Sequence, residues 1–256
     1  MKWVDTHTHL YSEQFDEDRD EMIQRAFRNG VETLLLPNID KESIQPMLDL
    51  VEKYPTQCYA MMGLHPGSVG ADWAEQLSLM KPYFSSHKMI AVGEIGMDLY
   101  WDQTFIEEQK QAFRQQIDWA KELQLPIVIH ARDAFDEIFE IIDDTIDERL
   151  SGVFHCFTGD SEQANKVLSY PNFFMGIGGV ITYRKAALDE VLANVPLEKM
   201  MMETDSPYLP PVPYRGKRNE SSYLVHSAQK LADTHQIKLS ELAEITSNNA
   251  KNLFKI

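Results

Sequence analysis

Residues 89–98 read MIAVGEIGMD, and the fold of the chain can be worked out from this stretch. It is apolar almost throughout. It does not alternate between apolar and polar residues, as a strand with one solvent-exposed face would. Such runs are typical of parallel strands that are covered on both faces. Seven similar runs recur at fairly even intervals: WVDTHTH (3–9), VETLLLP (31–37), CYAMMGLHP (58–66), PIVIHAR (126–132), GVFHCFTG (152–159), FFMGIGG (173–179) and MMMETDSP (200–207). We expect each run to contain one buried strand.

Amphipathic segments with helical spacing separate these runs. Residues 19–30 place four apolar side chains on one helical face, and Gly30 suits the end of that helix. Residues 105–126 repeat the pattern over a longer stretch, which Pro126 is expected to end. Strands that alternate with helices predict a parallel sheet with right-handed crossovers.

The number of strands decides between the two common α/β architectures. Eight strands favour a closed (β/α)8 TIM-type barrel over an open, doubly wound sheet. No change in composition and no flexible linker divides the chain, so residues 1–256 are expected to form a single barrel domain. Residues 209–222, LPPVPYRGKRNESS, are too rich in proline and glycine for a helix or strand. We predict that they form a loop at the barrel mouth.

The charge balance limits the possible partners. The 256 residues include 24 Lys and Arg against 40 Asp and Glu, a formal net charge of −16. Extended electrostatic binding of duplex nucleic acid is therefore not expected. A bound divalent cation can nevertheless reverse the local electrostatic field within a small anionic site. With only Cys58 and Cys156, no disulfide framework is predicted. No membrane helix or signal peptide is recognised, which predicts a cytoplasmic protein without membrane contact.

Polar residues gather at the carboxyl ends of the predicted strands, where barrels of this type carry their chemistry. Four histidines and two carboxylates from five strands belong to this set: His7, His9, Glu94, His130, His155 and Asp205. Taken alone, a His-x-His pair is more often structural than catalytic. Buried together without partners, these groups would cost several kcal/mol, so a cation is indicated.

The residue types restrict the choice of metal. Imidazole and carboxylate suit Zn²⁺, Mn²⁺ or Fe²⁺, and carboxylates also bind Mg²⁺. Six ligands exceed the four of one tetrahedral ion, so two divalent ions that share a carboxylate are expected. The remaining histidines outside this rim, His87, His226 and His235, are expected to face solvent.

Six motifs in this order resemble the TatD-type metal-dependent hydrolases, a family of amidohydrolase-like barrels that includes deoxyribonucleases. They are DTHTHL (5–10), GLHP (63–66), GEIGMD (93–98), HAR (130–132), HCFTG (155–159) and METDSPYL (202–209). The resemblance implies that one metal is bound by His7, His9, Glu94 and Asp205. It implies a second metal on Glu94, His130 and His155, with Glu94 bridging. His65 and Arg132 resemble the residues that contact substrate phosphate in this family.

The function expected from these residues is phosphodiester hydrolysis by a water that two metals activate. Asp205 and Glu94 are the predicted catalytic residues, and Asp205 is expected to accept the proton of the water. A deoxyribonuclease acting from a 3′ end suits an acidic protein, so the predicted partner is a nucleic acid strand end or a small phosphodiester. An ester or amide hydrolase, including an aminoacyl-tRNA deacylase, is the alternative. No obligate protein partner is evident.

Several neighbouring residues have more than one interpretation. Glu203 is interpreted as a supporting or packing residue, and Asp5 as a residue that orients a histidine or closes the core. Asp98 is expected to cap the following helix, and Cys156 to point away from the site as a small buried hydrophobe. Two further features have open roles. The basic residues Arg215, Lys217 and Arg218 either hold a second phosphate or lie in solvent, and Tyr208 either stacks on a base or packs against the loop.

Overall fold

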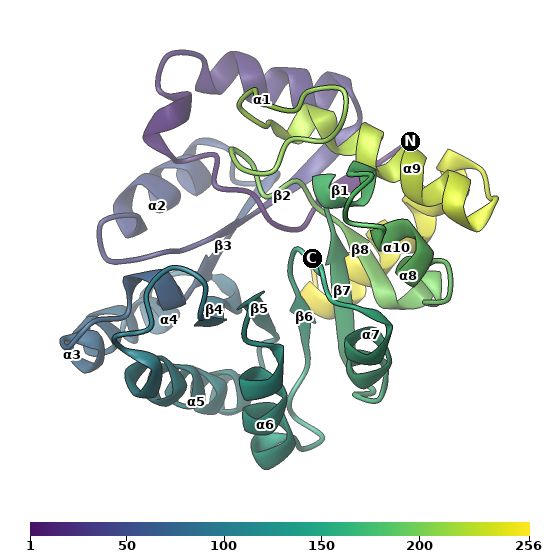
Figure 1. Cartoon of the computed structure of the whole chain (residues 1–256). Coiled ribbons are helices and arrows are strands. Elements are labelled where there is room, and N and C mark those ends of the chain that lie inside the picture. The colour runs from purple at the N-terminus through teal and green to yellow at the C-terminus, as the bar shows by residue number, and fades with distance from the viewer.

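Eight parallel strands form a ring in the order β1 to β8 in the computed structural model, which describes residues 1–256 (Figure 1). The strands are β1 (Trp3–Asp5), β2 (Val31–Pro37), β3 (Cys58–Met62), β4 (Met89–Asp98), β5 (Ile127–Arg132), β6 (Gly152–Phe154), β7 (Phe173–Ile177) and β8 (Met200–Met202). Each pairs with the next. A parallel bridge between Thr8 and Ser206 links the first and last strands, so the barrel is nearly closed. The predicted (β/α)8 TIM-type fold in a single domain is confirmed.

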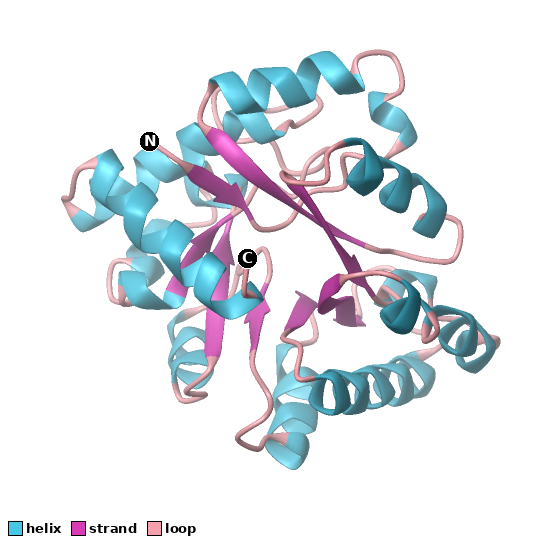
Figure 2. Ribbon diagram, turned by 180° about the vertical axis from the view of Figure 1, so that it is seen from behind, coloured by secondary structure: helices cyan, strands magenta, loops and turns pink.

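Helices surround the strands (Figures 1 and 2). They are α1 (Arg19–Arg28), α2 (Ile44–Lys53), α3 (Trp73–Met80), α4 (Tyr83–Ser86), α5 (Ile106–Leu123), α6 (Phe135–Thr145), α7 (Ser161–Leu168), α8 (Leu188–Leu192), α9 (Leu224–His235) and α10 (Leu239–Phe254). Short 3-10 helices are η1 (Glu13–Phe15), η2 (Pro66–Ser68), η3 (Gly179–Thr182), η4 (Leu197–Lys199) and η5 (Ser221–Tyr223). None of the helices combines the length and apolar character that a membrane crossing requires.

The apolar runs of the sequence are explained by two separate cores. In β2, Leu34 and Leu36 belong to the large core between the strands and the helices, whereas Leu35 belongs to a small core inside the barrel. Leu253 and Phe254 of α10 join this inner core, and Figure 2 shows the end of α10 lying over one end of the ring. That end is filled by apolar side chains, which leaves the carboxyl ends of the strands to form a site.

The two predicted helices are present with adjusted ends. In α1, Met22, Ile23 and Ala26 are buried, and Gly30 follows the end of the helix with φ 87°. α5 ends at Leu123, before the expected stop at Pro126, because Gln124 adopts a left-handed conformation with φ 54°. Several strands are shorter than the apolar runs, so the polar ends of the runs at 3–9, 152–159 and 200–207 lie in loops.

Candidate metal centre and substrate pocket

The six predicted ligands come together at the carboxyl ends of the strands. They come from the segment after β1, from β4 and β5, and from the segments after β6 and β8: His7, His9, Glu94, His130, His155 and Asp205. All are buried except His130, which is half-buried. Residues far apart in the sequence meet here because parallel strands in a barrel all end at the same rim.

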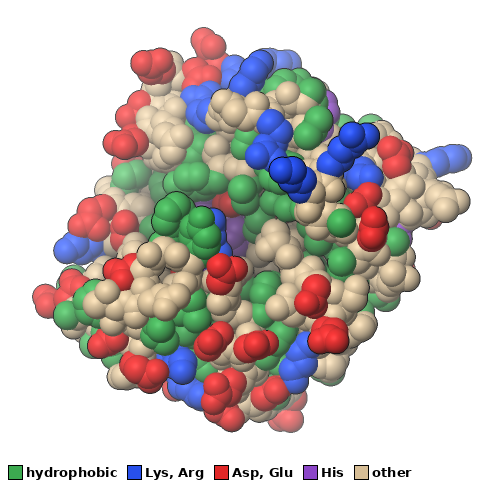
Figure 3. Space-filling model, viewed as in Figure 1, with side chains coloured by type: hydrophobic (Ala, Val, Ile, Leu, Met, Phe, Trp, Pro, Cys, Tyr) green, Lys and Arg blue, Asp and Glu red, His purple; other side chains and the backbone are tan.

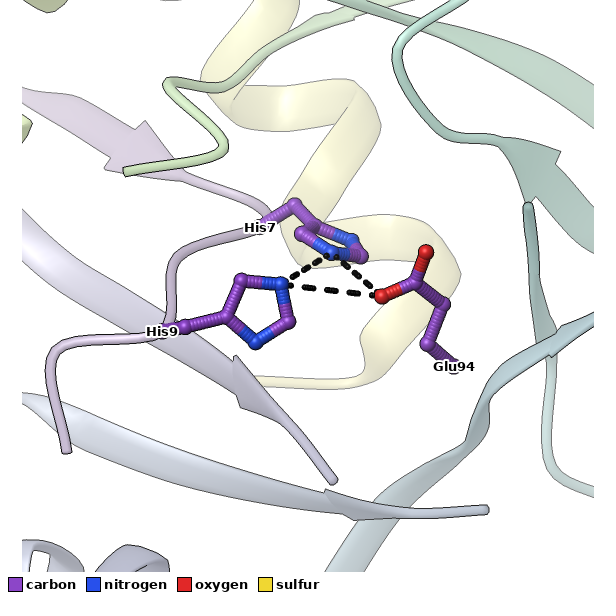
Figure 4. A group of neighbouring side chains, drawn as sticks. All are labelled: His7, His9 and Glu94. Carbon is purple, nitrogen blue, oxygen red and sulfur yellow. Dashed lines mark hydrogen bonds and ion pairs between the residues drawn. The ribbon is translucent and has the colours of Figure 1, made fainter. Parts of the chain in front are cut away.

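The carboxylate of Glu94 lies at the centre of this cluster. Its Oε2 is 3.1 Å from Nε2 of His7 and 3.6 Å from Nε2 of His9, and Figure 4 shows both rings directed at this oxygen. Its Oε1 is 2.9 Å from Nδ1 of His130 and 3.0 Å from Nε2 of His155. The two oxygens of one carboxylate therefore face two different pairs of histidines.

Asp205 adds a second carboxylate on the side of the first pair. Its Oδ1 lies 3.5 Å from Nε2 of His9 and 3.9 Å from Nε2 of His7. Its backbone N–H donates to the carbonyl of His7 at 2.9 Å, which ties the segment after β8 to the segment after β1. The grouping His7, His9, Glu94 and Asp205 is thus compact.

Three of the histidines have their outer nitrogen held by an acceptor. Nδ1 of His9 lies 2.8 Å from the hydroxyl of Tyr11, which itself donates to the carbonyl of Pro37 and so accepts from the ring. Nε2 of His130 lies 2.9 Å from Oδ2 of Asp98. These partners place the ring proton on the outer nitrogen and leave the lone pair of the inner nitrogen facing Glu94, as in metal-ligating imidazoles.

Glu203 does the same for His155. Its Oε1 lies 3.2 Å from Nδ1 of His155 and accepts the backbone N–H of Cys156 at 2.6 Å. Its Oε2 and Nδ1 of His7 are buried and have no hydrogen-bond partner. The donor set of nitrogens and carboxylate oxygens, with three of its four outer ring nitrogens held, fits one or two divalent cations.

The electrostatics of the cluster favour positive charge at its centre. Burial alone would raise the pKa of Glu94, but the neighbouring His155, His65 and His7 outweigh it and hold this pKa well below the usual value. Burial lowers the pKa of His155, yet Glu94 and Glu203 outweigh this effect and raise it well above the usual value. Either protons or divalent cations can supply this charge.

A pocket of about 1130 Å³ opens above the cluster. Figure 3 shows a hollow with histidine in its depth and hydrophobic side chains beside it. His65 lies in the pocket with Nε2 3.4 Å from Oε1 of Glu94. Its Nδ1 accepts the backbone N–H of Gly67 at 2.9 Å, so the neutral ring carries its proton on Nε2, which also lies 3.3 Å from Nδ1 of His130.

Arg132 lines the same pocket, and its guanidinium has no carboxylate partner. Its Cζ lies 4.0 Å from the ring centroid of Tyr100 and 5.2 Å from that of Trp101. A guanidinium stacked on a ring keeps its N–H edges free. His65 and Arg132 are therefore two donors beside the carboxylate cluster.

The structure decides the open role of Asp5 and corrects that of Asp98. Of the two roles considered for Asp5, it does not orient a histidine side chain; its carboxylate accepts the backbone N–H of Thr204 at 2.9 Å and the Thr204 hydroxyl at 2.6 Å, which joins β1 to the segment after β8. Burial raises the pKa of Asp5 to about 7. Asp98 does not cap a helix, because α5 begins only at Ile106; it holds His130 and accepts the backbone N–H groups of Tyr100 and Trp101.

Three other expectations are also corrected. Cys156 lines the pocket, because β6 ends at Phe154 and φ of 45° at Cys156 breaks the alternation of the strand. His235 is half-buried, with Nε2 3.1 Å from the carbonyl of Leu192, and is not free in solvent. Among the basic loop residues, Arg218 pairs with Asp18 through two 2.8 Å hydrogen bonds and is not available for a phosphate.

The role of Tyr11 was not predicted, and Asp98 and Glu203 were predicted without specific contacts. A signal was present for Asp98, which follows Glu94 by four residues and so repeats the period of a strand that keeps side chains on one face. Tyr11 offered no such signal, because it lies in a turn beyond β1, where that period does not apply. Glu203 could not be found in this way, because its partner His155 belongs to a strand that is not its neighbour.

Fold and site together define a metal-dependent hydrolase on a (β/α)8 barrel. The family described as TatD related DNase matches residues 4–255, and the chain belongs to this family. The uncharacterized metal-dependent hydrolase YabD of Bacillus subtilis is 39% identical over 98% of each chain. The 3′-5′ ssDNA/RNA exonuclease TatD of Salmonella typhimurium is 32% identical, also over 98% of each.

Solved structures agree with this membership. The crystal structure of YjjV, a TatD homolog from Escherichia coli K12, superposes with a TM-score of 0.91 at 31% identity, covering 99% of this chain and 98% of that one. A TatD family hydrolase from Entamoeba histolytica gives a TM-score of 0.85 at 21% identity, with coverage of 99% and 98%. The second likeness concerns the fold alone.

Proposed function

We propose that the protein is a phosphodiesterase that removes nucleotides from the 3′ end of single strands with the help of two divalent ions. The observation that carries this proposal is the division of Glu94: one oxygen faces His7 and His9, and the other faces His130 and His155. In this proposal one oxygen of Glu94 would hold each ion, and Asp205 would hold the first ion together with His7 and His9.

The ions, when bound, supply Lewis acidity at the phosphate and lower the pKa of the attacking water. The protein residues have separate tasks. Asp205 lines the pocket and is close enough to the histidine pair to bind metal and accept the proton of the water. Glu94 fixes the positions of both sets of ligands, because its two oxygens belong to one rigid carboxylate.

Arg132 and His65 are proposed to bind the scissile phosphate. The guanidinium presents a planar fork that matches two phosphate oxygens, and its ring contacts hold that fork in place. Nε2–H of His65, which lies 3.4 Å from Oε1 of Glu94, adds a third donor. Both residues line the pocket, so a phosphate over the cluster can reach them together.

The net charge of −16 supports a strand end as the substrate, since an acidic surface cannot hold a long duplex by its phosphates. The relatives named 3′-5′ ssDNA/RNA exonuclease support the same substrate class and the same polarity. Mg²⁺, Mn²⁺ and Zn²⁺ all suit the mixed nitrogen and oxygen ligands.

Metal-stripped protein reloaded with Mg²⁺, Mn²⁺ or Zn²⁺ tests the proposal. A 5′-labelled single strand should shorten stepwise from its 3′ end, and a strand blocked by a 3′ phosphorothioate linkage should resist. Asp205→Asn should lose most of this activity, while Asp118→Asn, on the exposed face of α5, should retain it. Rapid turnover of ester or amide substrates without shortening of any strand would contradict the proposal.

A further inference from the structure

Exposed apolar side chains are concentrated at one place on this protein. Only seven large hydrophobic residues are exposed in the whole chain: Met1, Leu79, Tyr100, Trp101, Tyr208, Leu209 and Val212. Four of these seven, at positions 100, 101, 208 and 209, line the pocket above the carboxylate cluster. Exposed apolar side chains beside a polar site are typical of a ligand-binding surface.

The turn that carries Tyr100 and Trp101 is tied to the metal centre by one carboxylate. Oδ1 of Asp98 accepts the backbone N–H groups of Tyr100 at 3.0 Å and Trp101 at 3.3 Å. Oδ2 of the same residue holds Nε2 of His130 at 2.9 Å. The two aromatic residues are therefore set at a defined position relative to the ligands of the site.

The two rings have different surroundings. The ring of Tyr100 is covered by the guanidinium of Arg132, whose Cζ lies 4.0 Å from its centroid. The ring of Trp101 meets that of Tyr100 edge-on, at 4.9 Å between centroids and 89° between planes. Trp101 remains 75% exposed. Arg132 thus lies closer to Tyr100 than to Trp101, whose ring centroid is 5.2 Å from the same Cζ, and most of the Trp101 side chain stays free.

We propose that Trp101 is a stacking platform for an unpaired nucleobase directly next to the scissile phosphate. This inference rests on the proposed function and adds a specificity-determining subsite to it. A phosphate held by Arg132 carries its base within reach of the neighbouring indole, and every base has an aromatic face to stack on it.

The net charge of the protein also supports an unpaired nucleobase as the ligand of Trp101. A chain with a net charge of −16 gains little from contacts with further phosphates, so affinity for a strand must come from another source. Stacking supplies it without basic residues. The subsite also favours single strands, because the faces of a base within a duplex are already covered by its neighbours.

The first test measures binding in the metal-loaded protein. Short single strands with a cleavage-resistant 3′ phosphorothioate linkage are titrated, and 5′-fluorescein anisotropy is read. Trp101→Ala should weaken binding about tenfold, and Trp101→Phe should weaken it less. Leu79→Ala, which removes an exposed hydrophobic residue outside the pocket, is the matched control and should bind as the wild type does.

The second test removes the base instead of the indole. Two strands carry an abasic residue, one at the 3′-terminal position and one at the penultimate position. On the strand that lacks the stacked base, the wild type and Trp101→Ala should bind with equal affinity. Neither protein can form the stacking contact with that strand. A preserved tenfold difference on both abasic strands, or no loss on the base-bearing strand, would overturn the inference.

The result that would contradict the proposed exonuclease activity differs from the result that would contradict the base subsite. If the wild type binds the resistant strands with the expected dependence on Trp101 but never shortens unmodified ones, exonuclease activity is wrong and the base subsite stands. If unmodified strands are shortened and Trp101→Ala leaves KM, kcat and strand affinity unchanged, the subsite is wrong and the activity stands. Absence of any strand binding by the wild type would overturn the subsite.

Discussion

Oε1 of Glu203 lies 3.2 Å from Nδ1 of His155, on the opposite side of the imidazole from Glu94. The carboxylate is fully buried, and its Oε1 also accepts the backbone N–H of Cys156. This arrangement sets the tautomer and the orientation of one ring of the cluster. Glu203 is thus a positioning residue, and we expect it to affect metal affinity.

Glu203→Gln is expected to weaken the binding of one metal ion about ten- to a hundredfold, because the loss of a buried carboxylate partner makes the imidazole a poorer ligand. Titration calorimetry of metal-stripped protein measures this change. Glu198→Gln, an exposed substitution in η4, is the matched control. Unchanged affinity for both ions in Glu203→Gln would show that the contact with His155 is only structural.

Gly176→Ala should reproduce part of this effect without altering a polar group. A Cβ at position 176 would lie 2.0 Å from Oε2 of Glu203, so the carboxylate that contacts His155 must shift. Weaker metal binding and a lower Tm are expected, and both can be measured on the same preparation. Gly178→Ala is the control, since its Cβ would have only ordinary contacts, the nearest at 3.7 Å.

Glu94→Ala is expected to leave the protein without two tightly held ions, because both sets of histidines lose the carboxylate that they share. Elemental analysis after dialysis, compared with the wild type and with the exposed substitution Glu52→Gln, gives the stoichiometry. Two ions retained by Glu94→Ala at wild-type affinity would refute the bridging role.

Arg132→Lys is expected to raise KM for a single strand about tenfold with a smaller change in kcat. Lysine keeps the charge but loses the planar fork and its stacking on Tyr100. Steady-state kinetics separate the two constants. Arg215→Lys is a close control, because Arg215 also stacks on a tyrosine, 3.7 Å from the ring of Tyr183, but does not line the pocket. Equal effects of the two substitutions would argue against phosphate binding by Arg132.

The ion pair between Asp18 and Arg218 makes the stability of the folded protein depend on pH. Hydrogen bonds from Arg218, with help from Arg25, hold the pKa of Asp18 at about 2. The folded pKa lies below the unfolded value, so the pair stabilises the fold at neutral pH and loses this effect as the pH falls from about 4 to about 2.

Asp18→Asn should therefore reduce the free energy of unfolding by about 1 kcal/mol at pH 7, since partial exposure screens the pair, and by progressively less toward pH 2. Urea denaturation over this range measures the difference. Asp118→Asn, which removes an exposed carboxylate without an ion pair, should show no such trend. A deficit of Asp18→Asn that stays constant down to pH 2 would contradict the assignment.

The sequence by itself determined the barrel and the chemical types at its rim. Runs such as residues 34–37 are apolar at consecutive positions and therefore on both faces, as strands buried on both sides require, and eight such strands alternate with helices. Because parallel strands end at one rim, His7, Glu94 and His130 could be brought together without coordinates.

The tertiary structure alone decided which atoms face each other. The last polar residues of several runs lie beyond short strands, where φ of 45° at Cys156 and 56° at Asp205 ends the alternation on which side-chain directions are predicted. Hydrogen bonds such as those of Glu203 to His155 and Asp98 to His130 depend on distances between strands. Periodicity along one strand contains no information about these distances, so the division of Glu94 between two histidine pairs appears only in the folded barrel.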